Sequence, residues 1–189
     1  MQKKLASVAT IQTGIYAKTV QEGDAVYLQS RHLNELGQID QGLTPNLYLD
    51  KKIEKYSLRE GDVLFPAKGT KNVSGVYQTR MGRAVASTSL FVIRIKNEFL
   101  NDLLPEYLSW FLNHPRSQKL LKTQAKGSSP PSISIKTLYD LIIQVPTTAT
   151  QEQILRIHSL RIRENELTQK IEELKERLLQ YRLYHSTNN

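Results

Sequence analysis

The sequence predicts a mixed α+β fold, in which a β-rich domain is followed by one long C-terminal α-helix that forms a coiled coil. Short runs of β-branched and aromatic residues recur through the first 150 residues, with a helical pattern between two of them. After residue 150, apolar residues follow a heptad pattern that no Gly or Pro interrupts before residue 183. We therefore expect a globular domain at residues 1–148 and a helical region at residues 149–189.

Four runs in the first part are rich in the residues that favour strands. Alternation of apolar and polar residues along them is partial, and polar or glycine-containing segments bound them. The expected strands cover residues 24–30, 61–65, 84–95 and 141–146.

Two helices are expected between the third and fourth strands. Leucine and phenylalanine recur at spacings of three and four over residues 101–114, where Asn101 or Asp102 can cap the first turn. A second helix is expected over residues 115–126 and should end at Gly127. The Ser- and Pro-rich segment after it is expected to be a loop.

The C-terminal helix is expected to begin at Gln151, because Thr150 and Gln153 make a capping box, and to reach Leu183. Apolar residues fall on alternating steps of three and four, and only Glu164 interrupts this seam. Such a seam is typical of a coiled coil, so we expect it to be the interface of a homodimer. The seam residues are Ile157, Leu160, Leu167, Ile171, Leu174, Leu178 and Tyr181.

The basic residues of this helix flank the seam. They stand at the heptad positions next to the core, so two copies in direct contact would bring like charges together. Burial of seven apolar residues, at about 1.5–3 kcal/mol each, outweighs a screened surface repulsion of under about 1 kcal/mol per pair. Pairing is therefore expected, and the basic flanks can also dock an acidic partner.

The composition favours an anionic partner. The net charge is +8, and two windows, residues 63–97 and 107–139, contain Lys and Arg but no acid. No apolar run is long enough for a membrane span or a secretory signal, and there is no cysteine. A cytoplasmic protein without disulfides or thiolate metal sites is expected.

The segment 65–83, "FPAKGTKNVSGVYQTRMGR", combines glycines with basic and amide side chains and follows a predicted strand. Lys and Arg neutralise phosphates, and Asn, Gln, Ser, Thr and Arg reach base edges, so we expect a loop that contacts double-stranded DNA. For any single residue, a solvated loop position is an equally good interpretation. The candidate DNA contacts are Lys68, Thr70, Lys71, Asn72, Ser74, Tyr77, Gln78, Arg80, Arg83, Lys126 and Ser128.

Catalytic motifs are missing. The four histidines are dispersed and form no metal-binding pattern, and "GTKNVSG" lacks the G-K-[ST] ending of a phosphate loop. In "SSPPS", Ser132 stands where an adenine methyltransferase has its stacking aromatic residue. We expect a binding protein that has no catalytic residues and needs no cofactor or metal.

The order of four segments, "ASVATIQTG", "YLQSRHL", "EGDVLFPAKG" and "SISIKTLYDLIIQVPTTATQEQI", followed by the heptad helix, resembles one half of the specificity subunit of type I restriction-modification systems. One departure is the link at residues 147–149, where the family commonly has a second proline and an apolar residue. The resemblance implies a target-recognition domain and a helical spacer. It also implies a non-catalytic reader of a bipartite DNA sequence that directs a methyltransferase subunit and a restriction subunit.

Because the family unit normally occurs twice per chain, the resemblance implies that two copies of this chain pair through antiparallel helices and read an inverted repeat. Two other interpretations stay open. The chain can be half of a longer two-domain subunit, or a coiled-coil adaptor whose basic head binds nucleic acid without sequence preference. An enzyme acting on nucleic acid is the least favoured interpretation, because the motifs are missing.

Overall fold

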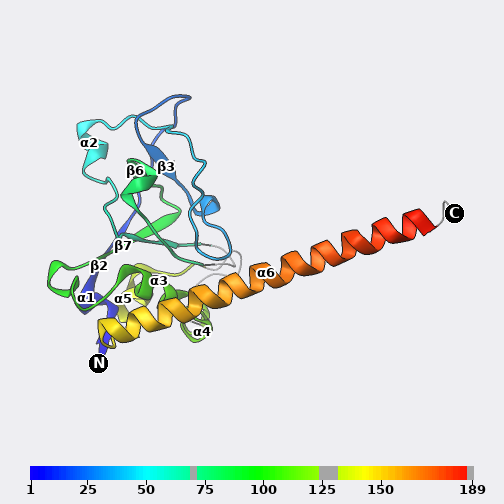
Figure 1. The fold of residues 1–189 in the computed structure, drawn as a ribbon. Helices are drawn as coiled ribbons and strands as arrows, with labels where there is room; N and C mark the ends of the chain where they lie inside the picture. Colours follow the sequence, from blue (N-terminus) through cyan, green and yellow to red (C-terminus); the bar gives the residue numbers. More distant parts are fainter. Residues whose placement is uncertain (69–71, 124–131, 187–189) are drawn as a thin grey trace. The chain divides into compact units, whose positions relative to one another are not determined.

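The computed structural model describes residues 1–68, 72–123 and 132–186. The chain divides into two compact units, Met1–Thr148 and Ala149–Asn189, the first a mixed α+β unit and the second formed by one long helix (Figure 1). The predicted α+β class with a long C-terminal helix is confirmed. No helix in the described part of the chain combines the length and apolar character that crossing a bilayer requires.

A four-stranded antiparallel sheet forms the centre of the first unit. Its order is β2 (Ala9–Thr13), β7 (Leu90–Ile95), β4 (Val63–Pro66) and β5 (Gly75–Val76). All four residues of β4 are buried, because it lies between β7 and β5 and is covered on both faces. The sheet therefore presents the chain after β4, and β5 beside it, from a rigid support.

The single long strand predicted at residues 84–95 is wrong. Its first part, β6 (Ala84–Ala86), pairs in parallel with β3 (Val26–Leu28), whereas its second part is β7 of the central sheet. A turn separates the two parts, where the hydroxyl oxygens of Ser87 and Ser89 lie 2.7 Å apart and the Ser87 hydroxyl accepts the Ser89 backbone N–H. Such local serine bonds compete with strand pairing, so the chain changes direction there.

The two ends of the first unit meet in a small antiparallel sheet. The strand β1 (Gln2–Lys4) pairs with β8 (Ile142–Gln144), which the sequence predicts within residues 141–146. Helix α1 (Leu5–Val8) follows β1, and α5 (Ile135–Asp140) precedes β8 with the Ser134 hydroxyl as its cap. Both termini of this unit are thereby closed onto its core.

The expected helices at residues 101–126 are present with different ends. Helix α3 (Pro105–Asn113) starts later than Asn101 or Asp102 would allow, because proline is favoured at the first helical position. Helix α4 (Pro115–Thr123) follows it directly, and its expected end at Gly127 lies outside the described residues. A further short helix, α2 (Lys51–Glu54), is capped by the carboxylate of Asp50.

The second unit is formed by helix α6 (Thr148–Ser186). It begins three residues before the predicted Gln151, so Thr150 lies within the helix rather than at the predicted cap position. Ala149 is a strong helix former and favours this earlier start. The predicted seam residues, from Ile157 to Tyr181, have exposed fractions of 49% to 68%. A single chain therefore leaves the whole apolar seam without cover.

Candidate nucleic-acid interface

The predicted DNA-contacting segment 65–83 is distributed between surface and core. Lys68 is exposed and forms a bridge with Ser132, which ties together the two segments where the sequence places basic loops. Gln78 is half-buried, and Arg80 and Arg83 are exposed. Thr70, Lys71, Lys126 and Ser128 lie outside the described residues.

Three of the predicted contacts are inside the protein. Asn72 donates from its amide to the carbonyl oxygen of Pro66 at 2.8 Å. The Ser74 backbone N–H donates to the side-chain oxygen of Asn113 at 2.7 Å, and the amide of Asn113 returns a bond to the Ser74 carbonyl at 2.9 Å. Tyr77 is 1% exposed. These three buried residues hold the segment in shape rather than facing a ligand.

The first acid-free window of the sequence acquires acidic partners in the fold. Arg94 makes two bonds to Asp62, at 2.7 and 2.6 Å, and Arg83 pairs with Glu54 at 3.0 Å. Lys96 donates to two backbone carbonyls of α1. Arg94 and Lys96 bond within the fold, and Arg83 is paired at the surface, so the unpaired basic surface at this window is smaller than the sequence suggests.

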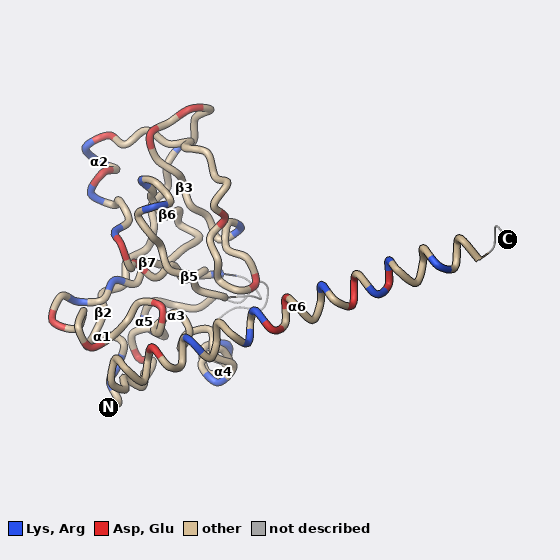
Figure 2. The backbone as a smooth tube through the Cα atoms, in the orientation of Figure 1, with Lys and Arg blue, Asp and Glu red and all other residues tan. Residues whose placement is uncertain are grey.

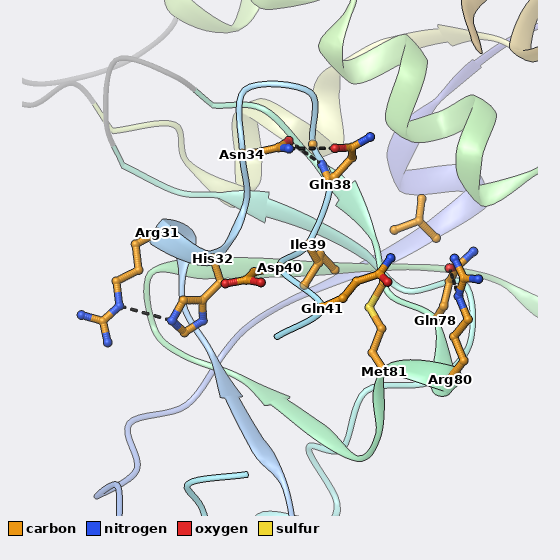
Figure 3. Close-up of a pocket in the computed structure, with 12 residues that line it drawn as sticks. Arg31, His32, Asn34, Gln38, Ile39, Asp40, Gln41, Gln78, Arg80 and Met81 are labelled. Atoms are coloured by element: carbon orange, nitrogen blue, oxygen red, sulfur yellow. Dashed lines mark hydrogen bonds between the residues drawn. The ribbon is translucent and has the colours of Figure 1, made fainter. Parts of the chain in front are cut away.

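A polar hollow of about 740 Å³ lies beside β5, between residues 31–41 and residues 76–81 (Figure 3). Its floor is apolar and includes the buried Ile39 and the partly buried Met81. Its polar rim can both donate and accept hydrogen bonds. The rim consists of Arg31, Gln38, Asp40, Gln41, Gln78 and Arg80.

One wall of the polar hollow is the short 3₁₀ turn η1 (Ser30–His32). The backbone N–H of Gln29 donates to Nδ1 of His32 at 3.2 Å, which leaves the proton of the neutral imidazole on Nε2. Burial and the neighbouring Arg31 lower the pKa of His32 below its ordinary 6.5, and Asp40 partly offsets them. The Arg31 Nε lies 3.3 Å from Nε2, and since both atoms then carry hydrogens, the Arg31 side chain is only weakly held.

The opposite wall is the turn η2 (Thr79–Met81). The Glu60 carboxylate accepts from the Thr79 N–H at 2.6 Å and from its hydroxyl at 2.8 Å, and these bonds lower the pKa of Glu60. Arg80 Nε donates to the side-chain oxygen of Gln78 at 2.8 Å (Figure 3). Gln78 and Arg80 thus form one supported pair at the rim.

Residues 31–41 are the part of the site that sequence reasoning missed. The signal was present, since three glutamines and an arginine follow the β3 strand within fourteen residues, in "QSRHLNELGQIDQG". This segment contains no cluster of basic residues, so the distribution of positive charge along the sequence does not identify it. Residues 31–41 form a site only together with residues 76–81, because both segments line the polar hollow.

Three of the five basic residues in the second acid-free window lie on α4. Arg116, Lys119 and Lys122 are exposed there, and Figure 2 shows this basic group at α4. Gln118 of the same helix donates to the carbonyl oxygen of Asn72 at 3.0 Å, which connects α4 to the segment 65–83. The fold therefore joins the two windows that the sequence keeps apart.

Within residues 1–68, 72–123 and 132–186, no three His, Cys, Asp or Glu side chains gather as a metal site would require.

The model of one protein family, the type I restriction modification DNA specificity domain, matches residues 1–176. The chain belongs to this family. The resemblance seen in the sequence is confirmed, and the family is one of non-catalytic specificity subunits, as expected.

Solved structures of specificity subunits share the fold of this specificity domain. The HsdS subunit from Thermoanaerobacter tengcongensis matches 87% of the chain with a TM-score of 0.60 and 18% identity. The S subunit of the M. genitalium type I system matches 85% with a TM-score of 0.57 and 14% identity. A chain from a study of complex assembly and conformational transition of the type I R-M system matches 87% with a TM-score of 0.62 and 16% identity.

These matches cover only 37% or 38% of the solved chains, so this chain spans less than half of their length. At identities below 20% the likeness shows the fold alone. No curated protein matches the sequence.

Proposed function

We propose that this chain is the DNA-reading component of a type I restriction-modification system, and that it reads sequence through the polar hollow. The hollow is the observation that carries the proposal, because it presents amide, guanidinium and carboxylate groups beside the edge strand β5 of a specificity domain. These groups match the donors and acceptors of base edges in the major groove. The exposed lysines of α4, in the same unit, can neutralise phosphates of the bound DNA.

The chain acts as a homodimer in this proposal. Helix α6 leaves seven apolar seam residues exposed in one chain, and a second α6 is a partner of matching length and pattern. Two-fold symmetry would present two recognition domains to an inverted repeat with a gap between its halves. A longer chain with a second recognition domain would supply the same arrangement without two-fold symmetry.

The basic flanks of the seam have a role in the same proposal. Several of these basic residues form ion pairs with glutamates of α6 itself, for example Arg163 with Glu166 at 3.3 Å and Lys170 with Glu173 at 3.0 Å. Exposed pairs of this kind contribute little stability, so an acidic partner can replace them at small cost. We assign this surface to docking of the methyltransferase subunit, and through it the restriction subunit.

The decisive experiment reconstitutes the chain with the methyltransferase subunit and a methyl donor, and maps the methylated adenines. The proposal expects methylation within one inverted bipartite sequence. Binding that weakens with salt but methylates no preferred sequence would instead support a basic-headed adaptor.

A further inference from the structure

Arg31 lines two hollows at once. The first is the polar hollow, and the second, of about 530 Å³, lies on the other side of η1. We call the second one the serine hollow. Its walls include Tyr16, Lys18, Arg31, Ser87, Thr88 and Ser89.

Hydrogen bonds fix the two hollows relative to each other. The Ser89 hydroxyl accepts the backbone N–H of Ser30 at 3.0 Å and lies 2.7 Å from the Ser87 hydroxyl. The turn that separates β6 from β7 therefore also anchors η1, which carries Arg31. Ser87 and Ser89, which interrupt the predicted long strand, thus also form a wall of the serine hollow and hold η1 in place.

The serine hollow has the chemistry of a phosphate site. Its lining residues, all of them in the described part of the chain, include Lys18 and Arg31 but no Asp or Glu. Thr88 and Ser89 contribute hydroxyl groups to the same lining. Hydroxyl donors together with Lys and Arg are the groups that contact the phosphate oxygens of DNA.

The polar hollow has a different chemistry, which suits bases. Among the described residues none bonds the side-chain amide of Gln41, which is exposed at the rim, so the amide is available to a ligand. A free glutamine amide can pair with N6 and N7 of adenine, and the apolar floor at Ile39 and Met81 can take a thymine methyl group. The hollow therefore fits an A·T base pair better than a phosphate.

We propose that the two hollows form one track on the DNA, in which Gln41 reads an adenine edge in the polar hollow while Lys18 holds a neighbouring phosphate in the serine hollow. Arg31 lies between them and contacts the strand at the junction. This assignment rests on the proposed function and names the parts of the site that carry it out.

Reconstituted complexes of the full chain with the methyltransferase subunit test the proposal. Gln41→Ala should relax the recognised sequence at one base pair of each half-site, with about a tenfold loss of preference there and the other positions kept. Gln41→Glu removes the amide donors and should shift that position away from adenine. Lys18→Ala should weaken binding to all sequences by a similar factor, leave the methylated sequence unchanged and lower the salt slope by about one.

Matched controls are Gln12→Ala on the exposed face of β2 and Lys52→Ala on α2, neither of which lines the polar hollow or the serine hollow. Both should behave as wild type, and thermal unfolding should show that every variant is folded. Unchanged sequence preference in both Gln41 variants, or a changed preference in Lys18→Ala, would overturn the track. If the wild-type complex methylates no preferred sequence, the proposed function fails, and the track with it.

Discussion

The backbones of Gly37 and Gly75 pack directly against each other. A Cβ atom on Gly37 would lie 2.1 Å from the carbonyl oxygen of Ser74, and one on Gly75 would lie 2.1 Å from the carbonyl oxygen of Gly37. Gly37 also has a φ of +76°, which favours glycine. This contact brings residues 31–41 against β5 and so closes the polar hollow.

Replacing Gly75 by alanine should therefore destabilise the domain and distort the hollow. The new methyl group meets backbone, which cannot turn aside, and overpacking of this kind costs about 1–3 kcal/mol. Urea unfolding measures the loss. Gly42→Ala is the matched control, because a Cβ there would meet only the Asp40 side chain, at 3.5 Å. Equal stability of the two variants would contradict the packing argument.

The Asp62–Arg94 pair should be a major structural contact. Asp62 is 1% exposed, its side chain accepts two bonds from Arg94 and also one from the Arg59 N–H, and the bond to Asp62 raises the pKa of Arg94. Removing one partner of a buried pair leaves the other uncompensated, so Asp62→Ala should cost about 3–5 kcal/mol in urea unfolding. The double variant with Arg94→Met should cost less than Asp62→Ala alone. A double variant that is less stable than the single one would argue against this account.

The same pair explains why the candidate site was only partly predictable. Arg94 belongs to a window that has no acid in sequence, yet Asp62, just before that window, neutralises it across the sheet. The charge of a sequence window depends only on residues that are neighbours in the chain. In the folded sheet, an acidic residue from another segment can lie beside a basic residue of that window. The buried Asn72 and Ser74 show the same effect, because a polar residue in a glycine-containing segment suggests a loop contact until its tertiary partner is known.

Features with a local physical cause were predictable. The heptad pattern predicts α6 to within a few residues of each end, and the buried run at β4 is recognisable from its composition. The polar hollow has no local cause. It exists because residues 31–41 and 76–81 meet through a glycine contact, and no periodicity encodes that meeting.

His32 should make the stability of the domain depend on pH. Its folded-state pKa is lowered, first by burial and then by Arg31, so the unfolded chain binds a proton more readily. Its contribution is therefore present above pH 6.5, the ordinary value, and is lost as the pH falls through the folded-state pKa. Urea unfolding at pH 7.5 and 5.5 should show a loss of stability in wild type that is smaller in His32→Asn. An equal loss in both proteins would assign the pH dependence to other groups.

The apolar seam of α6 should decide the oligomeric state. Leu174 lies at a core position of the heptads and is 51% exposed in one chain, whereas Gln169 lies on the opposite face. Leu174→Glu removes apolar burial of about 1.5–3 kcal/mol from each of two chains and adds a charge, so it should weaken the dimer by at least about a hundredfold. Gln169→Glu adds the same charge outside the seam and should remain dimeric.

Sedimentation equilibrium at tens of micromolar, with and without the methyltransferase subunit, distinguishes these outcomes. Monomers for Leu174→Glu together with dimers for wild type and Gln169→Glu would support pairing through the seam. A wild-type chain that stays monomeric under both conditions would eliminate the homodimer. The exposed seam would then require a different apolar partner, and the inverted symmetry expected of the DNA target would have no structural basis.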